Sequence, residues 1–283
     1  SDEAETYYKR ALEIDPDHAT NLCNYAVFLI EVRNRPDEAE TYYKRALEAD
    51  PDHAANLGMY ANFLWRTRKR PDEAENFYKR ALEVDPDHAN NLAGYGLFLR
   101  NARDRSDEAE TYYQRSLEVN PGDANNLSIY AGFLWRTRNR PDEAETYYKR
   151  ALEADPDHAD ILGNYAGFLL ARGARSEGFA LLARVASMDL PIKNNSLKME
   201  CAFYAFAHES EEAERLKALK AAKQLLADGA RSPDWDFSRN IERAEADGHS
   251  EPAFLKALAA VISEDADPET LDEFDIWKNV GEN

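Results

Sequence analysis

The hydrophobic positions in the first half of the chain follow a helical period, and the whole pattern recurs every 35 residues. The segment DEAETYYKRALEIDPDHA begins at Asp2, and close copies begin at Asp37, Asp72, Asp107 and Asp142. A weaker copy begins at Glu177. Two helical segments fit within one period. We therefore predict helical hairpins that stack into a solenoid, because one hairpin of about 35 residues cannot bury its apolar face alone.

We call the helix that begins at the aspartate helix B. Its apolar residues share one face at about 100° per residue. In the first copy these are Ala4, Tyr7, Tyr8, Ala11, Leu12 and Ile14. The opposite face, which we expect to be solvated, carries Glu5, Thr6, Lys9 and Glu13. Pro16 ends the helix, and Asp17 is placed to cap the next segment, helix A, which runs from about His18 to Arg33.

These residues resemble the tetratricopeptide repeats over residues 2 to about 190. Helix B has the small, aromatic and small residues of that family before a proline: Ala4, Tyr8, Ala11 and Pro16, then Ala39, Tyr43, Ala46 and Pro51. Helix A departs from the family, since Leu22, Tyr25-Ala26 and Leu29 stand where Trp, Leu-Gly and Tyr are usual. The resemblance implies an all-α, right-handed α-solenoid of stacked antiparallel hairpins, whose A helices line a concave groove for a partner.

The chain after about residue 190 keeps a helical pattern without the repeat. We predict a solenoid domain over residues 1–190, beginning at helix B, and degenerate helical repeats with an acidic C-terminal cap over 191–283. Helical segments are expected at 195–208, 210–228, 236–247, 251–264 and 268–280. Capping is the default role, because solenoids need atypical polar ends. A second hypothesis makes Phe274, Ile276 and Trp277 a docking peptide for an arginine-containing groove.

Helix A varies on one face. Its five copies begin at Ala19, Ala54, Ala89, Ala124 and Ala159. Positions 1, 4, 7, 10 and 11 of the helix never change, whereas positions 2, 5, 6, 9, 12 and 13 vary and cluster between about 120° and 240° around the axis. The solvated face of helix B has barely changed, which favours a recognition surface on helix A. Drift without selection is the alternative.

The candidate partner-binding residues lie on this variable face. Exposed Trp and Arg are frequent binding hot spots, and Asn offers both a donor and an acceptor to a peptide backbone. The candidates are Asn62, Trp65, Arg66, Asn90, Arg100, Asn125, Trp135, Arg136 and Asn164. The arginines favour an acidic or phosphorylated extended segment as ligand. Alternatively, they pair with carboxylates of neighbouring repeats, and Trp65 and Trp135 pack against the next repeat.

Composition narrows the function classes. The chain has 35 Lys and Arg against 54 Asp and Glu, a formal net charge of −19, which argues against a nucleic-acid or lipid-surface partner. No apolar run is long enough for a membrane helix, no signal peptide is apparent and only two cysteines occur, so we predict a cytoplasmic protein. The sequence shows no catalytic motif, and we predict no enzyme.

Histidines recur once per repeat, at His18, His53, His88 and His158. Stacked hairpins are about 10 Å apart, too far for these residues to share an ion whose ligands lie about 2 Å from it. We therefore expect no metal and no cofactor, and assign these histidines to the inter-repeat turn. The tyrosine pairs, such as Tyr7-Tyr8, are expected in the core.

The sequence thus predicts an interaction module that binds a protein or extended peptide in the groove of the A helices. The alternative is a sensor or regulatory module from a larger multidomain bacterial protein, since the chain opens in the middle of a repeat and is expected to be a fragment. A second copy is a further candidate partner, through the N-terminal helix or the acidic C-terminal helix.

Overall fold

The computed structural model of the chain describes residues 2–191, 194–233 and 235–280, and the remaining residues of the two predicted domains lie outside it. Within the described ranges every regular element is a helix and none is a strand, which confirms the predicted all-α fold. The helices form two compact units, residues 1–154 and 155–283. The predicted change near residue 190 falls inside the second unit and stays a prediction.

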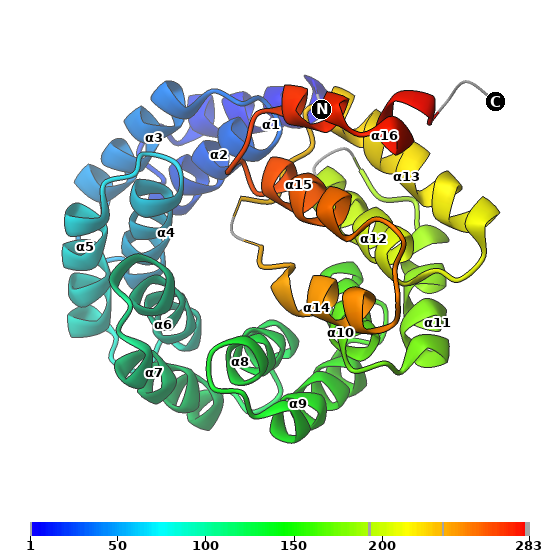
Figure 1. The fold of residues 1–283 in the computed structure, drawn as a ribbon. Helices are drawn as coiled ribbons and strands as arrows, with labels where there is room; N and C mark the ends of the chain where they lie inside the picture. Colours follow the sequence, from blue (N-terminus) through cyan, green and yellow to red (C-terminus); the bar gives the residue numbers. More distant parts are fainter. Residues whose placement is uncertain (1, 192–193, 234, 281–283) are drawn as a thin grey trace. The chain divides into compact units, whose positions relative to one another are not determined.

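The first unit alternates helices of B type and A type. The B helices are α1 (Asp2–Ile14), α3 (Pro36–Ala49), α5 (Pro71–Val84), α7 (Ser106–Val119) and α9 (Pro141–Ala154). The A helices are α2 (Ala19–Glu31), α4 (Ala54–Arg66), α6 (Ala89–Arg103) and α8 (Ala124–Arg136). Within this unit, Figure 1 shows the A helices on the inner side of the curved stack and the B helices on the outer side.

The histidine before each A helix is its N-cap. Nδ1 of His18, His53 and His88 accepts a hydrogen bond from the backbone N–H three residues on, at 3.3–3.4 Å. Asp123 takes this place in the fourth repeat and accepts from Asn126 at 2.8 Å. The expectation that Asp17 caps α2 is therefore wrong by one residue, because it is His18 that has the extended backbone of a cap.

A left-handed residue reverses the chain between each A helix and the next B helix. Asn34, Lys69, Asp104 and Asn139 have φ between 52° and 54°. The next backbone N–H then reaches back to the helix, as Arg35 does to the carbonyl of Leu29 at 2.9 Å. This bond, made by the residue after the left-handed one, closes the C-terminus of the helix as a Schellman motif does, but it spans six residues where the Schellman bond spans five.

The tyrosine pairs join each B helix to the A helices on both sides of it. The ring of Tyr42 meets Tyr25 of α2 edge-on, with ring centroids 4.7 Å apart. The next residue, Tyr43, packs on Tyr60 of α4 at 5.5 Å. Equivalent contacts recur in the following repeats. The expected core role of the pairs is thus confirmed, except for Tyr7, which is 59% exposed.

A glutamate of helix B stands at the centre of an ion-pair cluster in each repeat from α1 to α7. Glu40, whose side chain is 12% exposed, pairs with Lys44, Arg68 and Arg70 at 2.7–2.9 Å. Glu5 and Glu75 each have the same three kinds of partner, and Glu110 has the two arginines.

This cluster corrects the expectation of a solvated face on helix B for Glu5, whereas Thr6, Lys9 and Glu13 are exposed as expected. Glu5 is buried, because it is enclosed by Tyr25 of α2 and by Arg33 and Arg35 of the segment between α2 and α3. A structural reason therefore exists for the constancy of that glutamate. The contrast between a constant helix B and a variable helix A no longer indicates a recognition surface by itself.

The second unit begins with a regular hairpin and ends with irregular helices. Its elements are α10 (Ala159–Ala171), α11 (Arg175–Ala186), α12 (Asn195–His208), α13 (Glu212–Ala227), α14 (Ser238–Ala246), α15 (Pro252–Ile262), the 3-10 helix η2 (Pro268–Glu273) and α16 (Asp275–Asn279). The predicted single helix over 268–280 is wrong, because Phe274 is extended and separates η2 from α16.

The aromatic residues near the C-terminus pack inside this unit. Trp277 is 8% exposed, and its ring lies 6.0 Å from that of Phe254, with Nζ of Lys223 5.0 Å from its centroid. The rings of Phe274 and Phe254 are 5.4 Å apart. Phe274, Ile276 and Trp277 thus contribute to the core of their own unit, as a cap does, instead of forming a presented docking peptide.

Candidate functional site

The two tryptophans of the candidate set are buried. Trp65 is 8% exposed and Trp135 is 2% exposed. Trp65 points to the next repeat, where its ring meets Phe98 edge-on at 6.0 Å. Position 12 of helix A lies at the edge of the variable arc, close enough to the neighbouring A helix for a long side chain to reach it. The expectation that these tryptophans are exposed is wrong, and the alternative of packing against the next repeat is confirmed for Trp65.

The candidate arginines lie at the C-terminal ends of the A helices. The guanidinium of Arg66 stacks on the indole of Trp65, 4.9 Å from its centroid, and that of Arg136 on Trp135 at 5.2 Å. Arg66 is exposed, whereas Arg100 and Arg136 are half-buried. Nε of Arg100 donates to Oδ1 of Asn101 at 2.7 Å. The buried tryptophans thus orient two of the arginines.

The candidate asparagines divide by exposure. Asn62, Asn90 and Asn125 are exposed on α4, α6 and α8, and Asn164 is half-buried on α10 in the second unit. The neighbouring asparagines have structural roles that the sequence did not reveal. Nδ2 of Asn91, which is buried, donates to the carbonyl of Ala54 at 2.8 Å and joins α6 to α4.

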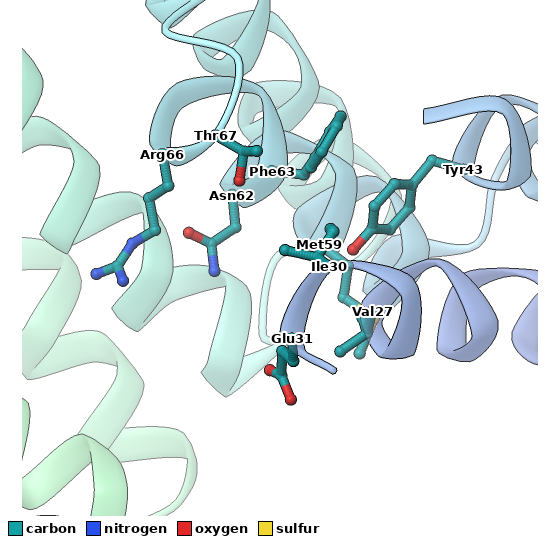
Figure 2. A pocket seen from close by; sticks show the side chains of 9 residues that line it. All are labelled: Val27, Ile30, Glu31, Tyr43, Met59, Asn62, Phe63, Arg66 and Thr67. Carbon is teal, nitrogen blue, oxygen red and sulfur yellow. The ribbon is translucent and has the colours of Figure 1, made fainter. Parts of the chain in front are cut away.

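A hollow of about 470 Å³ opens between α2 and α4, at the C-terminal halves of both helices (Figure 2). We call it the α2–α4 groove. Its lining residues are Val27, Ile30, Glu31, Tyr43, Met59, Asn62, Phe63, Arg66 and Thr67. It brings together two of the candidates, Asn62 and Arg66. The other seven do not line it.

The groove exists because α2 carries a smaller residue where α4 carries tryptophan. Ile30 and Trp65 occupy the same position, 12, of their helices. Trp65 packs on Phe98, and the residue equivalent to Phe98 one repeat earlier is Phe63, which lines the groove. The isoleucine covers less of that phenylalanine than an indole does, so space remains.

Apolar and charged groups both line the groove. In Figure 2, Ile30 and Met59 lie at the centre, Asn62 and Arg66 of α4 lie to their left, and Glu31 lies below them. The thiol of Cys23 contacts the sulfur of Met59 at 3.3 Å, which holds Met59 against α2. Burial raises the pKa of Tyr43, so its hydroxyl stays protonated at neutral pH and can donate a hydrogen bond.

Four lining residues were missed by the choice of hot-spot types. Val27, Ile30, Glu31 and Met59 occupy positions 9, 12, 13 and 6 of their helices, all of which vary between copies. Variability marked them, but a search for Trp, Arg and Asn passed over the apolar ones. Their chemistry suits an inserted apolar side chain.

A second hollow, of about 730 Å³, lies in the second unit between α11, α12 and α13. Its lining is mainly apolar, with alanines from all three helices and an ion pair between Lys217 and Glu214 at 3.2 Å. None of the nine candidate residues lines it. It therefore has no link to the variable face.

Within the described ranges, no group of three or more His, Cys, Asp and Glu side chains is placed to hold a metal ion. No described helix combines the length and the apolar character needed to cross a membrane.

Two repeat families match the chain. The tetratricopeptide repeat family matches residues 1–55 and 136–189, and the family of the middle TPR-like domain of cilia and flagella-associated protein 70 matches residues 30–128. Together they cover residues 1–128 and 136–189. No curated protein sequence matches the chain.

Solved structures share the fold at low identity. IFIT1, solved as a monomeric mutant with Gppp-AAAA, is 15% identical with a TM-score of 0.62 over 92% of this chain and 67% of that chain. The pilF protein of Pseudomonas aeruginosa is 18% identical, with a TM-score of 0.54 over 75% and 98%. A repeat protein of Parabacteroides merdae is 19% identical, with a TM-score of 0.53 over 92% and 91%.

Proposed function

We propose, for a chain that belongs to the tetratricopeptide repeat family through residues 1–189, that the α2–α4 groove binds an extended segment of a partner protein. Domains of this family are typically protein-interaction modules and usually non-catalytic. The groove binds one apolar side chain of that segment and the segment's backbone beside it.

One observation carries the proposal. The lining of the groove coincides with the part of helix A that varies between otherwise near-identical repeats. Six of its nine residues, Val27, Ile30, Glu31, Met59, Asn62 and Arg66, occupy variable positions. The hollow is thus formed by residues that distinguish one repeat from another, which supports a selective surface more strongly than variation alone.

The lining suggests the chemistry of the ligand. Ile30, Met59 and Phe63 offer an apolar seat for a side chain such as Leu or Met. Asn62 has a donor and an acceptor for the ligand backbone. Arg66, oriented by the indole of Trp65, favours an acidic residue at the neighbouring ligand position. Beyond it, Arg100 and Arg136 occupy the same ends of α6 and α8, so an acidic ligand continues along them.

An RNA ligand is a weaker candidate. IFIT1 was solved with Gppp-AAAA, but the likeness to it is one of fold. The present chain has a formal net charge of −19, and the carboxylate of Glu31 lines the groove. Both oppose a polyphosphate backbone. We therefore expect Gppp-AAAA not to bind at physiological salt.

The test selects a ligand first and then removes single groove groups. Peptides of about 12 residues are selected from a random display library on the full chain, and the affinity of the selected peptide is measured by fluorescence anisotropy. Asn62→Ala and Arg66→Ala are expected to weaken binding at least about fivefold each, since each removes a polar contact worth about 1 kcal/mol or more.

The matched control is Asn76→Ala, which removes an exposed asparagine from α5 on the outer side of the unit. It is expected to leave the affinity unchanged. Equal affinity of the Asn62→Ala, Arg66→Ala and unaltered chains would contradict the assignment of the groove. Selection of a ligand that competes with Gppp-AAAA would favour the RNA candidate instead.

A further inference from the structure

One cysteine and one methionine meet at the α2–α4 groove. Cys23 of α2 donates its S–H to the sulfur of Met59 in α4, and the two sulfur atoms are 3.3 Å apart. These residues occupy positions 5 and 6 of helix A, both of which vary between the five copies. No other copy has cysteine at position 5 or methionine at position 6. The sulfur pair is therefore a feature of this groove and not of the repeat.

The two sulfur atoms differ in accessibility. Cys23 is 0% exposed, whereas Met59 is 40% exposed and lines the groove beside Ile30 (Figure 2). Burial raises the pKa of the Cys23 thiol to about 12, so the thiol stays protonated at neutral pH and is a poor nucleophile. A thioether has no proton to lose before it reacts. Met59 is therefore the sulfur of the pair that an oxidant from solution attacks.

The other methionines of the chain are less accessible than Met59. The chain has three methionines in all. Met199 is 0% exposed, and Met188 is half-buried. Because the oxidant has to touch the sulfur, exposure makes Met59 the most readily oxidised of the three.

Cys23 leaves only one side of the Met59 sulfur open to this reaction. A thioether sulfur has two lone pairs, and the S–H of Cys23 is bound to one of them. Cys23 is itself 0% exposed, so an oxidant does not reach that side. Oxygen is then added at the other lone pair. Since the sulfoxide of methionine is chiral at sulfur, addition from one side gives one epimer.

We propose that Met59 is a site of oxidation by hydrogen peroxide, which gives predominantly one sulfoxide epimer and weakens the binding of the partner segment in the α2–α4 groove. The thioether sulfur attacks one oxygen of the peroxide. An S–O bond forms, the O–O bond breaks, and the released hydroxide takes the proton of the added oxygen and leaves as water. The sulfur loses two electrons and the peroxide gains them.

The loss of affinity follows from the polarity of the product, and this part of the proposal rests on the proposed function of the groove. Water solvates the sulfoxide oxygen in the free chain. An apolar ligand side chain on Ile30, Met59 and Phe63 removes that water and offers no hydrogen bond in return. We expect the oxidised chain to bind the selected peptide at least about tenfold more weakly than the reduced chain.

The first measurement needs no ligand. The full chain is treated with hydrogen peroxide, and peptide mapping by mass spectrometry follows each methionine. Met59 is expected to be oxidised at least about fivefold faster than Met199. Two methionine sulfoxide reductases of opposite epimer specificity, applied to the digested peptide, then give the ratio of the epimers. One reductase should reduce most of the Met59 sulfoxide.

Cys23→Ala removes the thiol that directs the oxidant. Alanine stands at the same position of α6, as Ala93, so the scaffold of helix A accepts it. Circular dichroism checks that the variant is folded. The two reductases are expected to reduce nearly equal shares of its Met59 sulfoxide, because both lone pairs are then open.

The second measurement is the affinity of the selected peptide before and after peroxide treatment, by fluorescence anisotropy. In Met59→Leu the affinity is expected to be the same before and after treatment, because the reacting sulfur is gone. Met188→Leu is the matched control, since it makes the same substitution outside the groove. It should stay as sensitive to peroxide as the unaltered chain.

Equal oxidation rates at Met59 and Met199, or equal shares of the two epimers in the unaltered chain, would overturn the proposal without reference to a ligand. A peptide that is weakened by Asn62→Ala and Arg66→Ala but not by oxidation would also overturn it, while the function of the groove would stand. A peptide that these two variants bind normally would contradict the groove and the expected loss of affinity, whereas the mapping would still decide the oxidation site.

Discussion

The indole of Trp65 in α4 packs edge-on against the ring of Phe98 in α6, with centroids 6.0 Å apart. This contact joins two successive repeats on the inner side of the first unit. The residue at position 12 of helix A therefore determines whether space remains between one repeat and the next. A tryptophan there closes the space to the next repeat, and the isoleucine at the same position of α2 leaves the groove open.

Trp65→Ala is therefore expected to lower the free energy of unfolding, because the indole is part of the packing between repeats and not part of an exposed binding surface. Removing a buried indole typically costs about 3 kcal/mol or more. Urea denaturation followed by circular dichroism measures the loss, with Asn62→Ala, an exposed residue on the same helix, as the control. A Trp65→Ala chain of unchanged stability would show that the contact with Phe98 carries little energy.

The ion pairs of Glu40 make the stability of the first unit decrease as the pH falls through the acid range. Burial raises the pKa of its carboxyl, but the hydrogen bonds from Lys44 and Arg70 lower it by more, to about 2. The unfolded pKa is about 4.3. The stabilisation is thus present above pH 4.3 and is lost as the pH falls towards 2.

Glu40→Gln is expected to cost about 2–3 kcal/mol at pH 7 and much less at pH 2.5, measured by urea denaturation at both values. Glu48→Gln, at an exposed carboxylate of the same helix, provides the control and is expected to change stability by less than about 0.5 kcal/mol. Equal losses at the two pH values for Glu40→Gln would refute the ion-pair explanation.

Gly58 is expected to reject a side chain. A Cβ there would collide with Oδ1 of Asn91, whose amide is buried and donates to the carbonyl of Ala54. Gly58→Ala should therefore destabilise by about 1–2 kcal/mol despite the higher helix propensity of alanine. At Gly94 the nearest atom is 3.4 Å away, so Gly94→Ala should stabilise by about 0.5–1 kcal/mol. Thermal melts of the two variants should move in opposite directions.

The caps of the A helices can be improved. Asp123 accepts its N-terminal hydrogen bond at 2.8 Å, whereas His88 accepts the equivalent bond at 3.3 Å. Asp is also the better N-cap and complements the helix dipole. His88→Asp is expected to raise stability by about 0.5–1 kcal/mol at pH 7, measured by urea denaturation. A lower midpoint would mean that the imidazole has a packing role that the carboxylate lacks.

The repeat architecture was predictable because each element is specified locally. The apolar period, Pro16 and the alternation of helices A and B repeat in every copy, and the structure follows them. Residue-level features were less predictable. Whether Trp65 is exposed, or Glu5 is enclosed, depends on side chains about 30 residues away in the neighbouring repeat. The end of the chain has no copy to compare with, and the break at Phe274 was missed.

The candidate site was predicted in part for the same reason. Variable positions marked the face of helix A on which the α2–α4 groove opens, and Asn62 and Arg66 line that groove. Nothing in the residue types showed that Ile30 opens space and Trp65 closes it. That difference appears only in the structure, where Ile30 of α2 faces α4 and Trp65 of α4 faces α6.

The central claim, that the α2–α4 groove binds the partner segment, is tested most directly by filling it. Ile30→Trp introduces at position 12 of α2 the residue that α4 and α8 already carry, against Phe63 in place of Phe98. Ile14→Trp, at a residue 86% exposed on α1, controls for an added indole. We predict that Ile30→Trp keeps the stability of the chain and weakens the selected peptide at least about tenfold, whereas Ile14→Trp does neither. Unchanged peptide affinity in a folded Ile30→Trp chain would contradict the claim.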